Sequence, residues 1–141
     1  MLIDFESAWL QLHPAFRRGL ELAYESLLGG GLAVGATLTD QDGRLVAEGR
    51  NRAYDPPGGP DALQGTPLAH AEMNAMAAAR TGWSMPDCTL WSTQQPCAMC
   101  AAAATFIDVG QIRYLAPDPW AIATGQPSSG YADGPLDGPW L

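Results

Sequence analysis

Residues 88–104 read CTLWSTQQPCAMCAAAA, a strand-like run followed by a helix-like run. Residues 88–93 combine aromatic and β-branched side chains, which favours a β-strand. Pro96 suits the first turn of a helix, and the alanines that follow predict a helix lasting to about Ile107. Residues 111–116 then predict another strand. Strand, helix and strand in succession are typical of an α/β fold.

The N-terminal half supplies two more helices and a hairpin. Apolar residues recur at helical spacing over 14–28 and stop at a run of glycines, and a second helix is predicted from Thr66 to Gly82. Between them, strands over 32–39 and 45–50 flank the turn sequence DQDG. This order predicts a mixed sheet with helices on its faces.

The 141 residues are expected to form one domain. We place its catalytic core at about 14–118 and a tail at 119–141, with one short helix near 120–124. No apolar run approaches the roughly 18 to 20 residues that a membrane span needs. The first residues, MLIDFE, are acidic and lack the basic and then apolar order of a secretion signal. We therefore expect a soluble, cytoplasmic protein.

The charge balance argues against a polynucleotide partner. Fifteen acidic residues outnumber seven basic ones, all of which are arginine, and the formal net charge is −8. Proteins that bind nucleic acid through its phosphates usually present a basic face. The composition favours a small-molecule substrate and makes nucleic-acid binding unexpected.

Three side chains are candidate metal ligands. Cys97 and Cys100 are three residues apart at the start of a predicted helix, so their sulfur atoms project from one face. The positive end of that helix favours the thiolates that a metal requires. His70, near the start of another helix, can add an imidazole nitrogen. Two thiolates and one imidazole prefer Zn²⁺ to Mg²⁺ or Ca²⁺.

The number of ligands indicates a catalytic metal. A structural zinc site normally closes with four protein ligands, whereas three leave a position for water. The other candidates are poor, because His13 is distant in sequence and Cys88 is better explained as a small buried side chain. One zinc ion per chain is expected.

Glu72 supplies the proton transfer that such a site needs. A carboxylate beside the metal, but not ligating it, can take a proton from water and deliver it to a ring nitrogen and then to departing ammonia. Residues two apart in mid-helix point in nearly opposite directions. His70 and Glu72 can therefore share one site only if the regular helix begins close to His70, later than the cap at Thr66 implies.

The spacing H-x-E…P-C-x-x-C is the signature of zinc deaminases. The chain resembles the cytidine deaminase-like superfamily, in the branch that contains tRNA adenosine deaminase, guanine deaminase and yeast-type cytosine deaminase. The resemblance covers roughly residues 15 to 118. Its segments are LAVGA (32–36), GRNR (49–52), AHAEMNA (69–75), LWST (90–93), PCAMC (96–100) and IRYL (112–115).

The resemblance implies further properties. It implies a three-layer α/β/α sandwich with a mixed sheet of roughly five strands, the fifth coming from the last 25 residues, and a homodimer. It implies that Asn51 hydrogen-bonds the base or sugar, and that the Ala71 backbone N–H contacts an exocyclic or carbonyl oxygen. Two features depart from the branch. Gln95 stands where many relatives carry Glu beside Pro96, and the loop over 51–66 is longer than in the tRNA enzyme.

The sequence thus predicts a zinc-dependent hydrolytic deaminase of a free nucleobase or nucleoside. A guanine-like purine leads, with cytosine, cytidine and adenosine close behind. Deamination of adenosine in tRNA or another nucleic acid is the first alternative. The others are a non-catalytic zinc-binding module and a thioredoxin-like redox pair at Cys97 and Cys100, which would leave His70 and Glu72 unexplained.

Overall fold

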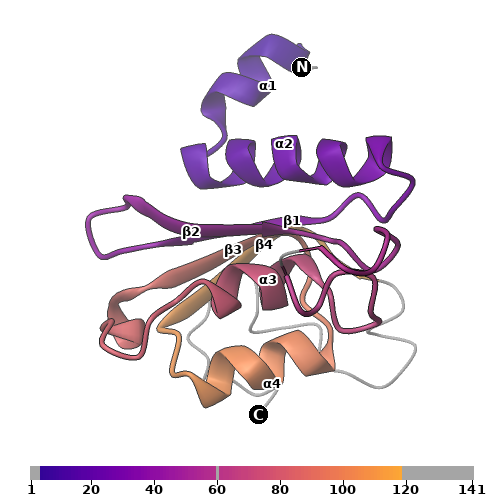
Figure 1. The fold of residues 1–141 in the computed structure, drawn as a ribbon. Helices are drawn as coiled ribbons and strands as arrows, with labels where there is room; N and C mark the ends of the chain where they lie inside the picture. Colours follow the sequence, from indigo (N-terminus) through magenta and orange to yellow (C-terminus); the bar gives the residue numbers. More distant parts are fainter. Residues whose placement is uncertain (1–3, 60, 119–141) are drawn as a thin grey trace.

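The computed structural model describes residues 4–59 and 61–118, in which one sheet is covered by helices on both faces (Figure 1). The helix α2 lies on one face, and α3 and α4 lie on the other. The predicted α/β/α layering is confirmed. The elements are α1 (Phe5–Gln11), α2 (Pro14–Leu28), β1 (Gly35–Thr39), β2 (Leu45–Arg50), α3 (Ala71–Ala77), the short 3-10 helix η1 (Met85–Asp87), β3 (Thr89–Gln94), α4 (Ala98–Phe106) and β4 (Gln111–Ala116).

The sheet is mixed and has the strand order β2-β1-β3-β4. β1 pairs antiparallel with β2 and β3, and β3 pairs parallel with β4 through the crossover helix α4. Leu90 on β3 lies between Leu38 on β1 and Ile112 on β4, and all three side chains are fully buried. The fifth strand and the short helix expected near 120–124 lie outside the described residues.

The predicted start of α3 at Thr66 is wrong, because regular helix begins only at Ala71. The Ala69 N–H bonds the Thr66 carbonyl oxygen in a turn, and the Ala69 carbonyl accepts the Arg52 N–H at 2.9 Å. The second bond joins Ala69 to the loop after β2. The Ala69 carbonyl is therefore bonded to that loop and not to an N–H of α3, and the helix starts after it. α3 also ends at Ala77, short of the predicted end at Gly82.

The start of α4 is displaced for a related reason. The Gln95 N–H donates to the Ala116 carbonyl at 2.8 Å, which extends the pairing of β3 with β4 to the residue before Pro96. The helix therefore starts at Ala98, with Cys97 as its N-cap. The N-caps of α3 and α4 thus lie one and two residues after a backbone bond that holds the chain to a loop or a strand.

The N-terminal part of the chain also differs from the sequence analysis at β1 and α1. The first strand begins at Gly35, where a Cβ would collide with the backbone carbonyl of Gly19, so the glycine pair lets α2 lie directly on β1. The helix α1 was not predicted. Asp4 caps it by accepting the Ser7 N–H at 2.8 Å, and none of its residues is buried.

No helix over residues 4–59 and 61–118 is both long enough and apolar enough to cross a membrane.

Candidate metal centre

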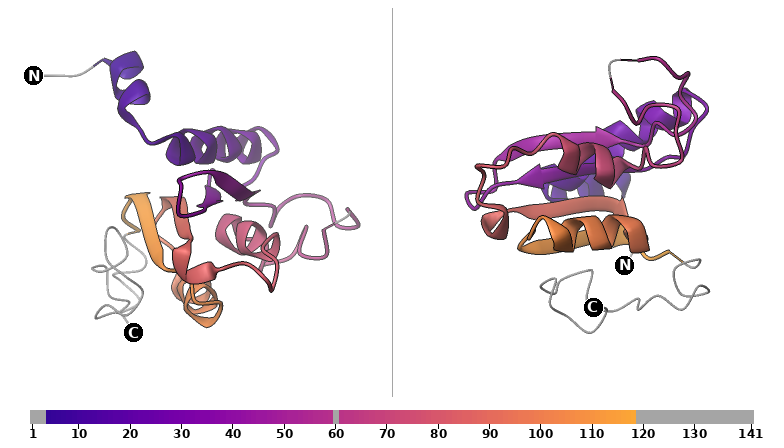
Figure 2. Two further views of the ribbon diagram at one scale, coloured as in Figure 1. Left: turned by 90° about the vertical axis from the view of Figure 1, so that its left-hand side faces the viewer. Right: turned by 60° about the horizontal axis from the view of Figure 1, so that its bottom comes forward.

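The three candidate ligands meet because two helices begin at the same end of one sheet face (Figures 1 and 2). His70 is the N-cap of α3, Cys97 is the N-cap of α4, and Cys100 lies in the first turn of α4. Neither N-cap side chain bonds its own helix. The imidazole and the thiol are therefore free to face each other instead of capping a backbone N–H.

The spacing of the donor atoms fits a zinc ion. His70 Nδ1 lies 3.5 Å from Sγ of Cys97 and 3.5 Å from Sγ of Cys100. Bonds of about 2.3 Å to sulfur and 2.0–2.1 Å to nitrogen at tetrahedral angles place nitrogen and sulfur roughly 3.5 Å apart. Within the described ranges these are the only three such side chains whose donor atoms gather closely enough, within 4.8 Å of one another, to hold an ion. The donor set and its dimensions therefore suit Zn²⁺.

The electrostatics of the thiols also favour a cation. The pKa of Cys97 falls to about 4, because the Cys100 thiol donates a hydrogen bond to it and His70 lies beside it. The pKa of Cys100 is raised by the neighbouring Cys97 thiolate, by burial and by Glu72. Contact with Cys97 raises the pKa of His70. A divalent cation is held by thiolates, so its binding must displace the proton of any thiol that it ligates.

Glu72 faces the same centre as His70. His70 lies outside the regular helix with extended backbone angles, so the two side chains are not on opposite faces of a helix turn. The Glu72 carboxyl accepts a hydrogen bond from Ser92 Oγ at 2.9 Å, and its second oxygen lies 3.5 Å from Cys100 Sγ. Burial raises the pKa of Glu72, since only 4% of the residue is exposed. Burial makes this carboxyl hold a proton more readily than an exposed one, which suits a group that must accept and return a proton.

A pocket of about 200 Å³ opens beside these side chains. Its described lining consists of Leu32, Val34, Asn51, His70, Glu72, Gln94, Gln95, Cys97 and Asp118. Leu32 and Val34 provide an apolar wall, and the described part of the lining contains no lysine or arginine. The pocket can therefore accept a small ring next to the candidate metal ligands. The carboxyl groups in its described lining are those of Glu72 and Asp118.

Asn51 and Ala71 lie differently with respect to this pocket. Asn51 lines it, and its Oδ1 accepts the Ala53 N–H at 3.1 Å, which leaves the amide nitrogen as its available donor. An ion pair between Arg50 and Asp55, at 2.9 Å, joins the residues on either side of Asn51 and so restrains this loop. Ala71 is fully buried and is not among the lining residues. Its N–H is at the first position of α3, where a helix offers no internal partner.

Sequence reasoning gave no role in the site to the polar residues Ser92 and Asp118, and it noted Gln95 only as a departure from related proteins. Ser92 is fully buried on β3, and a serine at a core-facing position of a central strand is a signal that could have found it. Gln95 Oε1 accepts the Asp118 N–H at 3.0 Å, a contact between distant residues that no local pattern indicates.

Cys88 and His13, which the sequence analysis rejected as metal ligands, lie away from the candidate metal centre. Cys88 is 5% exposed and belongs to the hydrophobic core, as predicted. His13 caps α2 through Nδ1 and stacks on Trp91 with ring centroids 4.1 Å apart. Trp91 is half-buried and donates its indole N–H to Thr39 Oγ1 at 2.8 Å.

Known proteins resemble the chain along most of its length. A tRNA(Ile)-lysidine synthase of Deinococcus radiodurans is 36% identical over 86% of this chain, which spans only 20% of that protein. A guanine deaminase of Bacillus subtilis is 30% identical over 80% of this chain and 70% of its own length. The solved structure of a tRNA:A34 deaminase superposes with a TM-score of 0.66 at 28% identity, covering 85% of this chain and 93% of that one.

The family model for the cytidine and deoxycytidylate deaminase zinc-binding region matches residues 11–116. That range contains both metal-bearing helix starts and the whole described sheet. The predicted superfamily is thereby confirmed, with zinc as its metal: the chain belongs to the cytidine and deoxycytidylate deaminase family.

Proposed function

We propose that this protein hydrolyses the exocyclic amino group of a free nucleobase or nucleoside and releases ammonia. The observation that carries the proposal is the buried carboxyl of Glu72, placed against a three-ligand metal centre at the wall of a pocket. A fourth protein ligand would suit a purely structural metal. Among the described residues no further histidine, cysteine or carboxylate joins the group.

Each side chain has a distinct part in the proposed reaction. His70, Cys97 and Cys100 would hold zinc, which when bound supplies Lewis-acid activation of water near neutral pH. Glu72 accepts a proton from the attacking water on the oxygen that faces Cys100, and passes it to the ring nitrogen next to the reacting carbon. The water's second proton then leaves with the amino group, so an amino-substituted ring and water give an oxo-substituted ring and ammonia.

The pocket residues would select the ring. Leu32 and Val34 offer apolar surface for a flat heterocycle, and Asn51 offers a fixed amide donor to its edge. We infer that the Ala71 N–H binds an oxygen of the substrate. A guanine-like purine is our first choice, supported by the similarity to the guanine deaminase of Bacillus subtilis. Cytosine, cytidine and adenosine come next.

Charge favours a free base or nucleoside over a polynucleotide. Four of the seven arginines are paired with carboxylates: Arg18 with Glu48, Arg44 with Asp42, and both Arg50 and Arg52 with Asp55. The paired carboxylates neutralise arginine charge that could otherwise bind a phosphate backbone. Glu72 and Asp118 add acidic groups at the pocket itself.

A tRNA adenosine is the second candidate substrate. It is favoured by the superposition on a tRNA:A34 deaminase, of which the chain covers 93%. The similarity to a tRNA(Ile)-lysidine synthase points to tRNA as well, although the chain matches only a fifth of that protein. The test is ammonia release by the zinc-loaded protein from a panel of bases, nucleosides and tRNA transcripts. Turnover of a free base or nucleoside with no tRNA turnover supports the proposal, and turnover of tRNA alone contradicts it.

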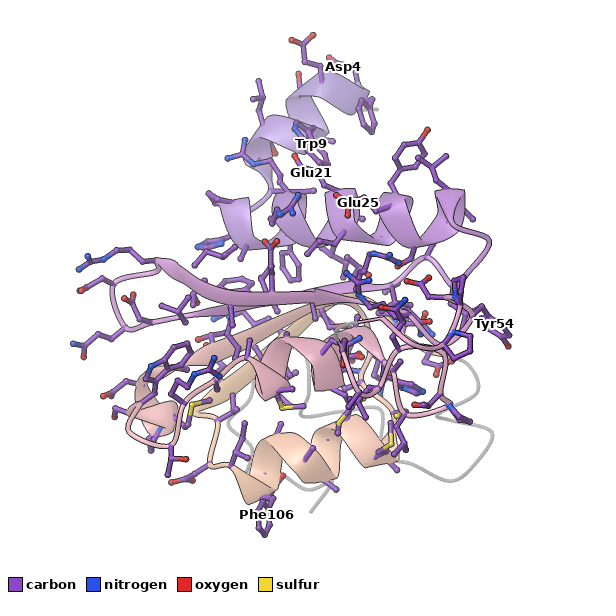
Figure 3. The ribbon with its side chains drawn as sticks, in the orientation of Figure 1. Asp4, Trp9, Glu21, Glu25, Tyr54 and Phe106 are labelled. Atoms are coloured by element: carbon purple, nitrogen blue, oxygen red, sulfur yellow. The ribbon has the colours of Figure 1, made fainter. Side chains whose placement is uncertain are left out.

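We also propose that the protein is a homodimer. Phe106 is 90% exposed and projects outward from the end of α4 (Figure 3), a helix without any charged residue. An apolar side chain on an uncharged helix face is suited to contact a second copy. Light scattering at several protein concentrations distinguishes a dimer from a monomer, and Phe106→Ser should shift the equilibrium toward the monomer.

A further inference from the structure

Ser92 is held in the sheet on both sides. It lies on β3, paired with Ala36 on β1 and with Tyr114 on β4, and none of its surface is exposed. A residue paired on both edges in the middle of a sheet has little freedom to shift. Its hydroxyl is therefore a fixed polar group in an otherwise apolar layer.

The Ser92 hydroxyl donates its one hydrogen bond to Glu72. Ser92 Oγ donates to Glu72 Oε1 at 2.9 Å, and accepts the Gln94 N–H at 3.4 Å. The backbone donor at Gln94 occupies the acceptor side of the hydroxyl, so the hydroxyl hydrogen points toward the carboxyl.

The two carboxyl oxygens of Glu72 contact different groups. Oε1 is engaged by Ser92, while Oε2 lies 3.5 Å from Cys100 Sγ at the metal centre. We propose that Ser92 is a positioning residue, which fixes the carboxyl of Glu72 so that Oε2 remains next to the metal ligands. The proposal rests on the proton-transfer role of Glu72 under the proposed function.

The expected effect of losing this hydroxyl is on turnover. Removing an outer hydrogen-bond partner of a metal site typically costs about 10- to 100-fold in activity or metal affinity. Ser92 does not line the described pocket, so Ser92→Ala should lower kcat by about 10- to 100-fold with KM nearly unchanged. Ser92→Thr keeps a hydroxyl at the same position and should restore most of the lost kcat.

Thr93 provides a matched control. It is the next residue on β3, is 7% exposed, and its hydroxyl accepts the Gly35 N–H at 3.1 Å on the opposite side of the strand. Thr93→Val removes a buried hydroxyl from the same strand without touching Glu72. It should lower the denaturation midpoint and leave kcat close to that of the unchanged protein.

A second readout does not depend on activity. In a double-mutant cycle, Ser92→Ala should lower the denaturation midpoint of the zinc-loaded protein, and this shift should largely disappear in the Glu72→Ala background. Equal shifts in both backgrounds, or an unchanged kcat in Ser92→Ala, would overturn the proposal. If the unchanged protein releases no ammonia from any substrate, the proposed function fails, and the cycle alone decides whether Ser92 fixes Glu72.

Discussion

Gly49 on β2 controls how closely α3 approaches the sheet. A Cβ at this position would collide with the Ala75 backbone nitrogen and lie 2.5 Å from the Ala71 carbonyl oxygen and 2.8 Å from Asn74 Cβ. Two of these three atoms belong to the backbone of α3, so no side-chain rotation relieves the contact. Gly49→Ala therefore forces β2 and α3 apart.

The magnitude follows from these distances. The contact with Ala71 must widen from 2.5 Å to at least 3.4 Å before it becomes an ordinary packing contact. Overpacking of this kind typically costs about 1 to 3 kcal/mol of unfolding free energy. The displaced end of α3 carries His70, so its donor nitrogen moves relative to the sulfur atoms of Cys97 and Cys100. Gly49→Ala should therefore lose both stability and zinc affinity.

The assay is denaturant unfolding of zinc-loaded and chelator-treated protein, together with zinc competition against an indicator dye. Gly82→Ala is the control, because a Cβ there meets nothing within 4 Å. It should change the unfolding free energy by no more than about 0.5 kcal/mol. If Gly49→Ala also stays within about 0.5 kcal/mol and keeps its zinc affinity, the close approach of β2 to α3 is not what positions the centre.

Three further outcomes are expected. Cys100→Ser should abolish tight zinc binding by metal analysis, since it removes one of the three donors found among the described residues, and retention of one zinc per chain would contradict the assignment. Leu38→Ala should lower the unfolding free energy by about 2 to 5 kcal/mol in urea, because Leu38 is fully buried, and a smaller loss would show that the core collapses around the cavity. Glu48→Gln tests an exposed ion pair: the Arg18 guanidinium lowers the pKa of Glu48, so the pair stabilises the fold above the ordinary carboxyl pKa and ceases to do so as pH falls through the lowered value. The variant should be less stable by about 0.2 to 1 kcal/mol at neutral pH and converge with the unchanged protein in acid, whereas a difference that persists in acid would refute the electrostatic cause.

Local sequence signals predicted the sheet well. The bounds expected for β2 and β4 agree with the structure, and α2 occupies the predicted residues 14–28. These elements have strong periodicity or clear end signals of their own. The tight glycine approaches of α2 to β1 and of β2 to α3 were not predicted, because they depend on which elements meet in space.

The site was predicted as a set of residues but not as an arrangement. The spacing of His70, Cys97 and Cys100 identified side chains that the structure brings together. The late start of α3 depends on the bond between Arg52 and Ala69, which sequence periodicity does not contain. The contact of Ser92 with Glu72 spans 20 residues and likewise needed the fold.

The central claim is that Glu72 transfers protons at a zinc centre. The measurement that tests it most directly compares the zinc content and ammonia release of the unchanged protein with those of Glu72→Gln, using the best substrate of the panel. Our account predicts one zinc per chain in both proteins and the loss of nearly all turnover in the variant, because an amide cannot accept and return the proton. Undiminished ammonia release by a zinc-loaded Glu72→Gln protein would contradict it.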